Sequence, residues 1–204
     1  MKYAEEIIKK GYPVFIDKPV CNTYEDIEKL EKLAKEYDNV ICGGSGLKYN
    51  KQISELRELI NSGHFENIRG GTINHSADIN CPFDGIFFYL PHAVEMMLEL
   101  FGYEPKSLTT TVLTNDNFTV NVKYEDKIVN LAINGCNTCY VVINGTKSIS
   151  KEIDSSDIFI NEVGHFIHCI EKNEIVKDVT KLTKHVKIIL AVKESMETNK
   201  EVIL

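Results

Sequence analysis

The stretch GYPVFIDKP, residues 11–19, decides the fold. Its apolar part, residues 13–16, is a short continuous run of the kind found in strands that are buried on both faces of a parallel sheet. Residues 1–10 precede it as a predicted helix with an apolar face, and Gly11 ends that helix. A helix followed by a buried strand predicts an alternating α/β arrangement at this end of the chain.

The residues after this stretch continue the alternation. Thr23 with Asp26 resembles a capping box and predicts a helix whose apolar stripe runs to Tyr37. Residues 39–42 predict a second strand. Two strands joined by one crossover helix cannot cover both faces of a sheet, so other structure is expected to complete this region.

Beyond residue 45 the pattern changes to that of an α+β fold with an open, mostly antiparallel sheet backed by helices. Residues 118–124 alternate apolar and polar side chains, which indicates a strand with one buried face. Asn134-Gly135 and Asn144-Gly145 predict hairpin turns. The other expected strands are residues 68–75, 107–113, 128–133, 138–143 and 202–204. The expected helices are residues 50–62, 91–102, 157–172 and 181–199.

Composition limits the classes of partner. The 204 residues carry a formal net charge of −7, so nucleic acid is not expected as a partner. No apolar run approaches the ~20 residues that span a bilayer, and residues 1–10 do not have the pattern of a signal peptide. A cytoplasmic location is therefore expected, with the six cysteines mostly serving as small buried hydrophobic residues.

Four stretches together resemble the Gfo/Idh/MocA oxidoreductases. Residues 11–19 are similar to the family's GKPVFxEKP segment, with Asp17 in place of glutamate. Residues 92–102 are similar to its HxxD…lxG helix, with Glu95 in place of aspartate. Residues 47–63 and 195–204 resemble two further segments in the family's order and spacing.

The resemblance implies a two-domain enzyme that binds NAD or NADP in a Rossmann domain. Residues 1–45 then correspond to a remnant βαβ unit of that domain, and residues 46–204 to the substrate and oligomerisation domain. The family's motif lysine and helix histidine fall on Lys18 and His92, beside the nicotinamide and the reacting carbinol. Asp17, Lys18 and Pro19 are the expected cofactor contacts.

Alcohol oxidation gives these two residues a chemical rationale. A cation at Lys18, just past a strand end, can stabilise a developing alkoxide, although a solvated surface lysine is the alternative. A neutral imidazole at His92 can accept the proton, and the first turn of a helix disfavours the imidazolium. Glu95 and Glu99 share its helix face, and a carboxylate there is expected either to orient the ring or to raise its pKa. An exposed helix-start histidine is the alternative.

One departure from the family's pattern concerns the substrate. The family usually has an acid four residues before the histidine, and Phe88 occupies that position here. Either the substrate differs from a typical polyol or the site has decayed. The expected substrate-binding residues are Lys48, His75 and Tyr89, with Asp84 expected nearby; a surface role for Lys48 is equally open.

Three other motifs are weaker. Gly44-x-Gly46-x-x-Tyr49 lacks the third glycine of a dinucleotide fingerprint and is interpreted as an interdomain hinge. The Cys136-x-x-Cys139 pair is isolated, and unconnected thiols are favoured. His165 and His168 are helix neighbours without an evident third ligand, so no metal site is predicted.

Two functions remain open. In one, the chain is part of an oxidoreductase acting on a sugar, polyol or related hydroxy compound. It would be incomplete on its own because it lacks the glycine-rich cofactor loop, and a separate Rossmann-domain polypeptide is a candidate partner. In the other, it is a non-catalytic module that binds a small molecule or only oligomerises. Both are compatible with a homo-oligomer formed through the sheet face.

Overall fold

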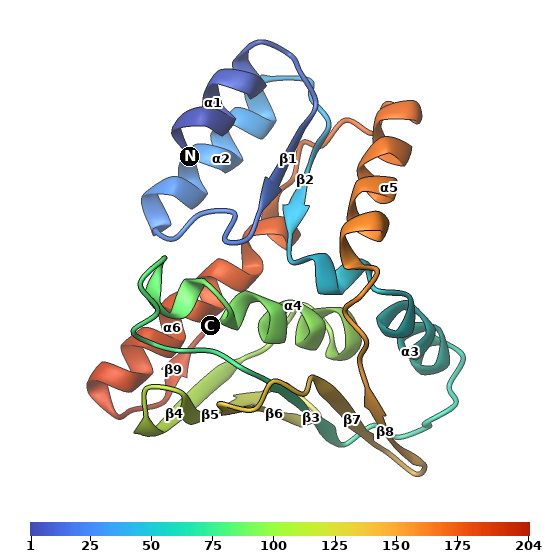
Figure 1. Ribbon diagram of the computed structural model, residues 1–204, viewed down its shortest axis with the longest axis vertical. Coiled ribbons are helices and arrows are strands. Elements are labelled where there is room, and N and C mark those ends of the chain that lie inside the picture. The colour runs from blue at the N-terminus through green and yellow to red at the C-terminus, as the bar shows by residue number, and fades with distance from the viewer.

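The computed structural model describes residues 1–204 and contains two sheets joined by helices (Figure 1). The smaller is a two-stranded parallel sheet, and the larger has seven strands in the order β8-β7-β3-β6-β5-β4-β9. All pairs in the larger sheet are antiparallel except β3 with β6. This is the expected α+β class, with an open, mostly antiparallel sheet preceded by a βαβ unit.

The smaller sheet is formed as the sequence predicts. The helix α1 (Lys2–Lys9) leads into β1 (Val14–Asp17), and α2 (Tyr24–Glu36) crosses to β2 (Ile41–Gly44). Thr23 caps α2, since its hydroxyl accepts a hydrogen bond from the Asp26 amide at 3.1 Å. The expected capping residue is thereby confirmed.

The larger sheet and the remaining helices follow in chain order. These elements are α3 (Lys51–Asn61), β3 (Gly70–His75), α4 (Leu90–Phe101), β4 (Ser107–Thr114), β5 (Asn117–Lys123), β6 (Ile128–Asn134), β7 (Tyr140–Asn144), β8 (Ser148–Glu152), α5 (Ile158–Glu171), α6 (Thr180–Thr198) and β9 (Val202–Ile203). Two short 3₁₀ turns occupy Gly46–Tyr49 and Gly85–Phe87. No helix is both long enough and apolar enough to cross a membrane.

One of the two expected hairpins is wrong. Asn144-Gly145 does connect the antiparallel pair β7 and β8. Gly135 has the positive φ (66°) expected of a turn, but β6 and β7 do not pair, because β3 lies between them. The parallel pairing of β3 with β6 joins segments more than fifty residues apart, and local turn chemistry carries no information about it.

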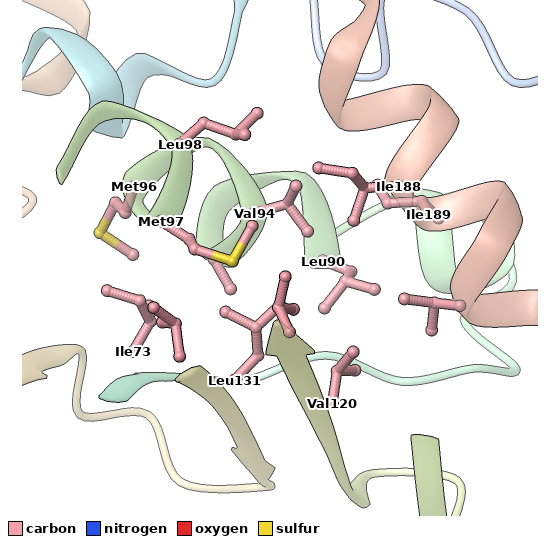
Figure 2. Close-up of a cluster of buried hydrophobic side chains, with 14 of the residues drawn as sticks. Ile73, Leu90, Val94, Met96, Met97, Leu98, Val120, Leu131, Ile188 and Ile189 are labelled. Carbon is pink, nitrogen blue, oxygen red and sulfur yellow. The ribbon is translucent and has the colours of Figure 1, made fainter. Parts of the chain in front are cut away.

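The main core lies between the larger sheet and the helices α4 and α6 (Figure 2). In β5 the alternate residues Phe118, Val120 and Val122 are buried, as their period-two pattern predicts. Helix α4 is buried almost all round, and Figure 2 shows Ile188 and Ile189 of α6 beside it. This buried helix holds its first turn rigidly above the sheet.

Two smaller clusters pack on the two faces of the β1–β2 sheet. Helices α1 and α2 cover one face, with Ile8, Leu30 and Ile41 among the buried residues. Helix α5 covers the other, where Phe166 packs edge-on against Phe15. Strand β1 pairs only with β2, so its other edge is free.

Candidate active site

A cavity of about 430 Å³ lies where the two sheets meet. Lys18 reaches it from just beyond the carboxyl end of β1, the edge at which α/β sheets present ligand-binding groups. His75 enters from the last residue of β3, and His92 from the first turn of α4, with Tyr89 beside it. The fold therefore brings together residues that are far apart in sequence.

Lys18 is held against Phe88. Its Nζ donates a hydrogen bond to the Phe88 carbonyl at 2.7 Å and lies 3.9 Å from the centroid of the Phe88 ring. Partial burial lowers the pKa of the Lys18 ammonium. Phe88 thus offers a carbonyl oxygen and an aromatic face to the cation, at the position where the family's pattern has a carboxylate.

Asp17 and Pro19, the residues on either side of Lys18, differ in where they lie relative to the cavity. Asp17 lines the outer part of the cavity, exposed to solvent, and its carboxylate accepts the Lys18 amide at 2.7 Å. Pro19 is not among the lining residues. Only Lys18 of the three expected cofactor contacts reaches the interior.

His92 is fixed by a residue that the sequence did not indicate. Its Nδ1 lies 2.6 Å from the hydroxyl of Ser45, and that hydroxyl also accepts the Leu47 amide. A hydroxyl can donate to a bare Nδ1 or accept from a protonated one, so Ser45 is compatible with either charge state of the ring. Burial, with His75 and Lys18 nearby, lowers the pKa of His92 to about 3. The imidazole is therefore neutral at physiological pH.

His75 stands beside His92, with ring centroids 5.2 Å apart. Its Nδ1 is 2.7 Å from the Ser76 carbonyl, which can only accept, so Nδ1 carries the proton and Nε2 has a free lone pair. Burial lowers the pKa of His75 as well. The cavity thus contains one cation and two neutral imidazoles.

The two acids of α4 do not orient His92 as expected. Glu95 turns away from the cavity: its carboxylate accepts the Ser45 amide at 3.1 Å and lies 3.0 Å from His185 Nδ1 and 3.1 Å from Lys48 Nζ. Glu99 pairs instead with Arg57 and Tyr103. Both carboxylates meet cations and hydrogen-bond donors on neighbouring elements instead. Glu95 therefore affects His92 only indirectly, by binding the amide of Ser45, whose hydroxyl contacts the ring.

Two other expected residues lie outside the cavity. Lys48 is committed to the buried pair with Glu95. Asp84 accepts a hydrogen bond from Asn22 at 3.3 Å and does not line the cavity. The polar groups available to a substrate hydroxyl therefore include Lys18, His75, Tyr89 and His92. Asp17, Ser155 and Glu162 also line the cavity.

The glycine-rich segment at residues 43–46 is packed against protein and does not form a phosphate cradle. A Cβ on Gly43 would lie 2.2 Å from the Ile16 carbonyl, and one on Gly44 would lie 2.4 Å from a Glu95 carboxylate oxygen. A Cβ on Gly46 would meet the Glu162 carboxylate at 2.6 Å. These glycines permit close packing against the Ile16 backbone, the Glu95–Lys48 pair and Glu162, so protein atoms fill the space that a pyrophosphate would need.

Solved structures with a similar fold include three oxidoreductases. An apo scyllo-inositol dehydrogenase from Lactobacillus casei matches with a TM-score of 0.85 and 16% identity, over 99% of this chain and 75% of that one. An inositol dehydrogenase homolog from Azotobacter vinelandii, complexed with NADH and myo-inositol, matches with a TM-score of 0.82 and 14% identity, over 100% and 74%. An aldose-aldose oxidoreductase from Caulobacter crescentus, complexed with glycerol, matches with a TM-score of 0.79 and 15% identity, over 100% and 75%.

The chain thus has the fold of the inositol and sugar dehydrogenases, as its resemblance to the Gfo/Idh/MocA oxidoreductases implies. It spans about three quarters of the length of these structures. At these identities the likeness concerns the fold. No family model and no curated protein matches the sequence.

Proposed function

We propose that this chain supplies the substrate side of a site that transfers a hydride between NAD(P) and a sugar, polyol or related hydroxy compound. The observation that carries the proposal is the convergence of Lys18, His75 and His92 on one cavity between the two sheets. Under this proposal residues 1–45 are the remnant of the dinucleotide-binding domain, and residues 46–204 are the substrate domain.

The chain's own residues divide the chemistry between them. The Lys18 ammonium binds the substrate oxygen and stabilises negative charge that develops on it. The neutral His92 exchanges a proton with that oxygen through Nε2, while Ser45 holds Nδ1. His75 and Tyr89 bind neighbouring hydroxyl groups. The nicotinamide, when bound, supplies the hydride donor or acceptor.

The residues present fit the substrate side of such a site and do not fit the cofactor's pyrophosphate. The glycine-rich segment is filled by protein atoms and flanked by carboxylates. We propose that a separate dinucleotide-binding part holds the phosphates and adds a strand to the free edge of β1. The apolar side chains that α5 leaves exposed, among them Phe159, Ile160 and Val163, support a further covering element.

The test is ligand binding followed at the histidines. With labelled imidazoles, we expect saturable NMR shifts of His75 and His92 on titration with myo-inositol, glycerol or an aldose. Lys18→Met should weaken that binding by about tenfold, the worth of one charged hydrogen bond. Lys32→Met, on the exposed face of α2, is the matched control. Absence of saturable shifts with every polyol would contradict the proposal.

A parallel titration concerns the cofactor. Calorimetry with NAD(H) and NADP(H) is expected to give no binding tighter than millimolar, because no phosphate cradle is formed. Micromolar binding by these 204 residues would show that the assignment of the pyrophosphate site to a separate part is wrong.

The second candidate is a non-catalytic binding or oligomerisation module, favoured by Phe88 in place of the acid. It predicts polyol binding, or none, without turnover when a dinucleotide-binding polypeptide is supplied. Both candidates include a homo-oligomer formed through the outer face of the seven-stranded sheet. Light scattering after size exclusion checks that part, and a monomer at micromolar concentration would contradict it.

A further inference from the structure

A second group of reactive side chains lies on the α5 face of the β1–β2 sheet, away from the Lys18 cavity. The Sγ atoms of Cys42 and Cys169 and the imidazole of His165 offer three ligand atoms within 4.8 Å of one another. Cys42 is on β2, and His165 and Cys169 are one turn apart on α5. His165 Nε2 is 3.4 Å from Cys169 Sγ.

The separation of His165 Nε2 from Cys169 Sγ is close to that in a tetrahedral metal site, and Cys42 Sγ lies within 4.8 Å of both atoms. With Zn–S near 2.3 Å and Zn–N near 2.0–2.1 Å, ligand atoms of a tetrahedral site lie roughly 3.5–3.8 Å apart. The 3.4 Å between His165 Nε2 and Cys169 Sγ is within a few tenths of an ångström of that range. Two thiolates and an imidazole form a soft ligand set that selects zinc over magnesium or calcium.

A fourth ligand is available at the same place. A cavity of about 220 Å³ adjoins the cluster and is lined by Cys42, His165, Cys169 and Glu174. Glu174 follows α5 closely in the chain, and its carboxylate is the acidic group of this cavity wall nearest in sequence to Cys169. Lys48 also lines this cavity, but its charge is paired with Glu95. The side open to the cavity can therefore accept a carboxylate oxygen or a water molecule.

We propose that Cys42, His165 and Cys169 bind one zinc ion, with Glu174 or water as the fourth ligand. Binding replaces the two S–H bonds by two Zn–S bonds, and the two protons pass to solvent. The ion would connect β2 to α5 and so fasten the helix to the face of the smaller sheet. This site does not depend on the proposed oxidoreductase function.

Cobalt binding provides the direct test. After chelator treatment in a reductant that does not bind metal, the full chain is titrated with Co²⁺. We expect one equivalent to produce thiolate charge-transfer absorption and the intense visible bands of a tetrahedral ion, both displaced by Zn²⁺. Substituting a residue that only supports a metal ligand typically costs about 10–100-fold in metal affinity. Cys169→Ser removes a ligand itself and should therefore weaken binding by more than that.

Cys136→Ser is the matched control, because Cys136 is an exposed thiol of the CxxC pair and is not part of the proposed cluster. It should leave the spectrum and the affinity unchanged. If Cys136→Ser abolishes the absorption and Cys169→Ser does not, the ion binds at the other pair and the proposal is wrong.

Alkylation of the unmodified chain makes the test independent of how the variants fold. Zn²⁺ should protect Cys42 and Cys169 from a thiol reagent, as read by mass spectrometry, and leave Cys136 reactive. Because both thiols are buried, the reaction time is chosen so that the zinc-free chain labels both of them. Equal labelling of Cys42 and Cys169 with and without Zn²⁺ at that time would overturn the proposal.

Discussion

The two sheets differ in how far each is stabilised by its own core. The seven-stranded sheet shares a cluster of 33 buried residues with α4, α6 and neighbouring segments. The two-stranded sheet has clusters of 8 and 3, and these include residues from α5 and from the segment before α6. The larger region is therefore stabilised mainly by its own residues, with Cys21 and Ile27 added from the smaller one, whereas the smaller region depends on elements supplied by the rest of the chain.

This difference bears on the candidate site, because the cavity takes residues from both regions. His75 and His92 belong to the self-sufficient part, whereas Lys18 follows a strand of the dependent part. The distance between the cation and the imidazoles therefore depends on how firmly the smaller sheet stays docked. Substitutions can test each side of this comparison separately.

The largest effect is expected where the two regions meet. Glu95 is buried between Ser45, Lys48 and His185, so Glu95→Gln leaves the Lys48 charge without a counterion. Loss of one partner of a buried pair costs about 3–5 kcal/mol of unfolding free energy. Denaturant unfolding measures it. Glu55→Gln, which breaks the more exposed pair with Lys151, should cost less than about 1 kcal/mol.

A matched pair of cavity substitutions separates the two cores. Leu131 on β6 and Leu30 on α2 are both fully buried. Leu131→Ala should lower the global stability by about 2–5 kcal/mol. Leu30→Ala should mainly speed hydrogen exchange within residues 1–45, because that region can open without unfolding the larger sheet. Equal loss of protection throughout the chain in both variants would contradict the comparison.

Acid should destabilise the protein through its buried histidines. Burial lowers the pKa of His75, His92 and His185 below the value near 6.5 that they have when unfolded. The unfolded state therefore binds more protons just below pH 6.5, and stability falls as the pH is lowered from 6.5 to 5.5. Each histidine contributes at most about 1.4 kcal/mol over that unit.

The contribution of one histidine can be isolated. His92→Asn should make the stability less steeply dependent on pH in this window, as followed by denaturant titrations at several pH values. A slope unchanged by the substitution would show that His92 is not buried as a neutral ring.

The smallest effect concerns an ion pair that joins the two regions at the surface. Lys187 on α6 lies 3.2 Å from Glu31 on α2, and both side chains are partly exposed. Such pairs contribute about 0.2–1 kcal/mol, so Lys187→Met should change global stability by no more than that. A double-mutant cycle with Glu31→Gln measures the coupling, which should diminish in high salt.

Local patterns in the sequence predicted most elements and the fold class, because each depends on neighbouring residues. The capped start of α2 at Thr23, the alternation in β5 and the buried stripe of α4 are of this kind. The hairpin predicted at Asn134-Gly135 is wrong because a strand from residues 70–75 inserts beside β6. That pairing is non-local, so the residues of the turn do not indicate it.

The candidate site was predictable to a similar extent. Lys18 and His92 stand in motifs that the family resemblance identifies, and the structure brings both to one cavity. Ser45 was missed because a serine among glycines reads as a hinge, and Glu95 was misplaced because helix spacing does not indicate which neighbour a carboxylate will meet. Cys42 joins His165 and Cys169 only through the tertiary fold; their one-turn spacing on α5 was the sole local signal.

Helix α6 connects the two regions that form the cavity. Its 19 residues pack along the larger sheet and α4 and also reach α2 and β2 (Figure 1). A substitution on α6 can therefore change the position of Lys18 relative to His75 and His92 without touching the cavity, because the helix contacts elements on both sides of it.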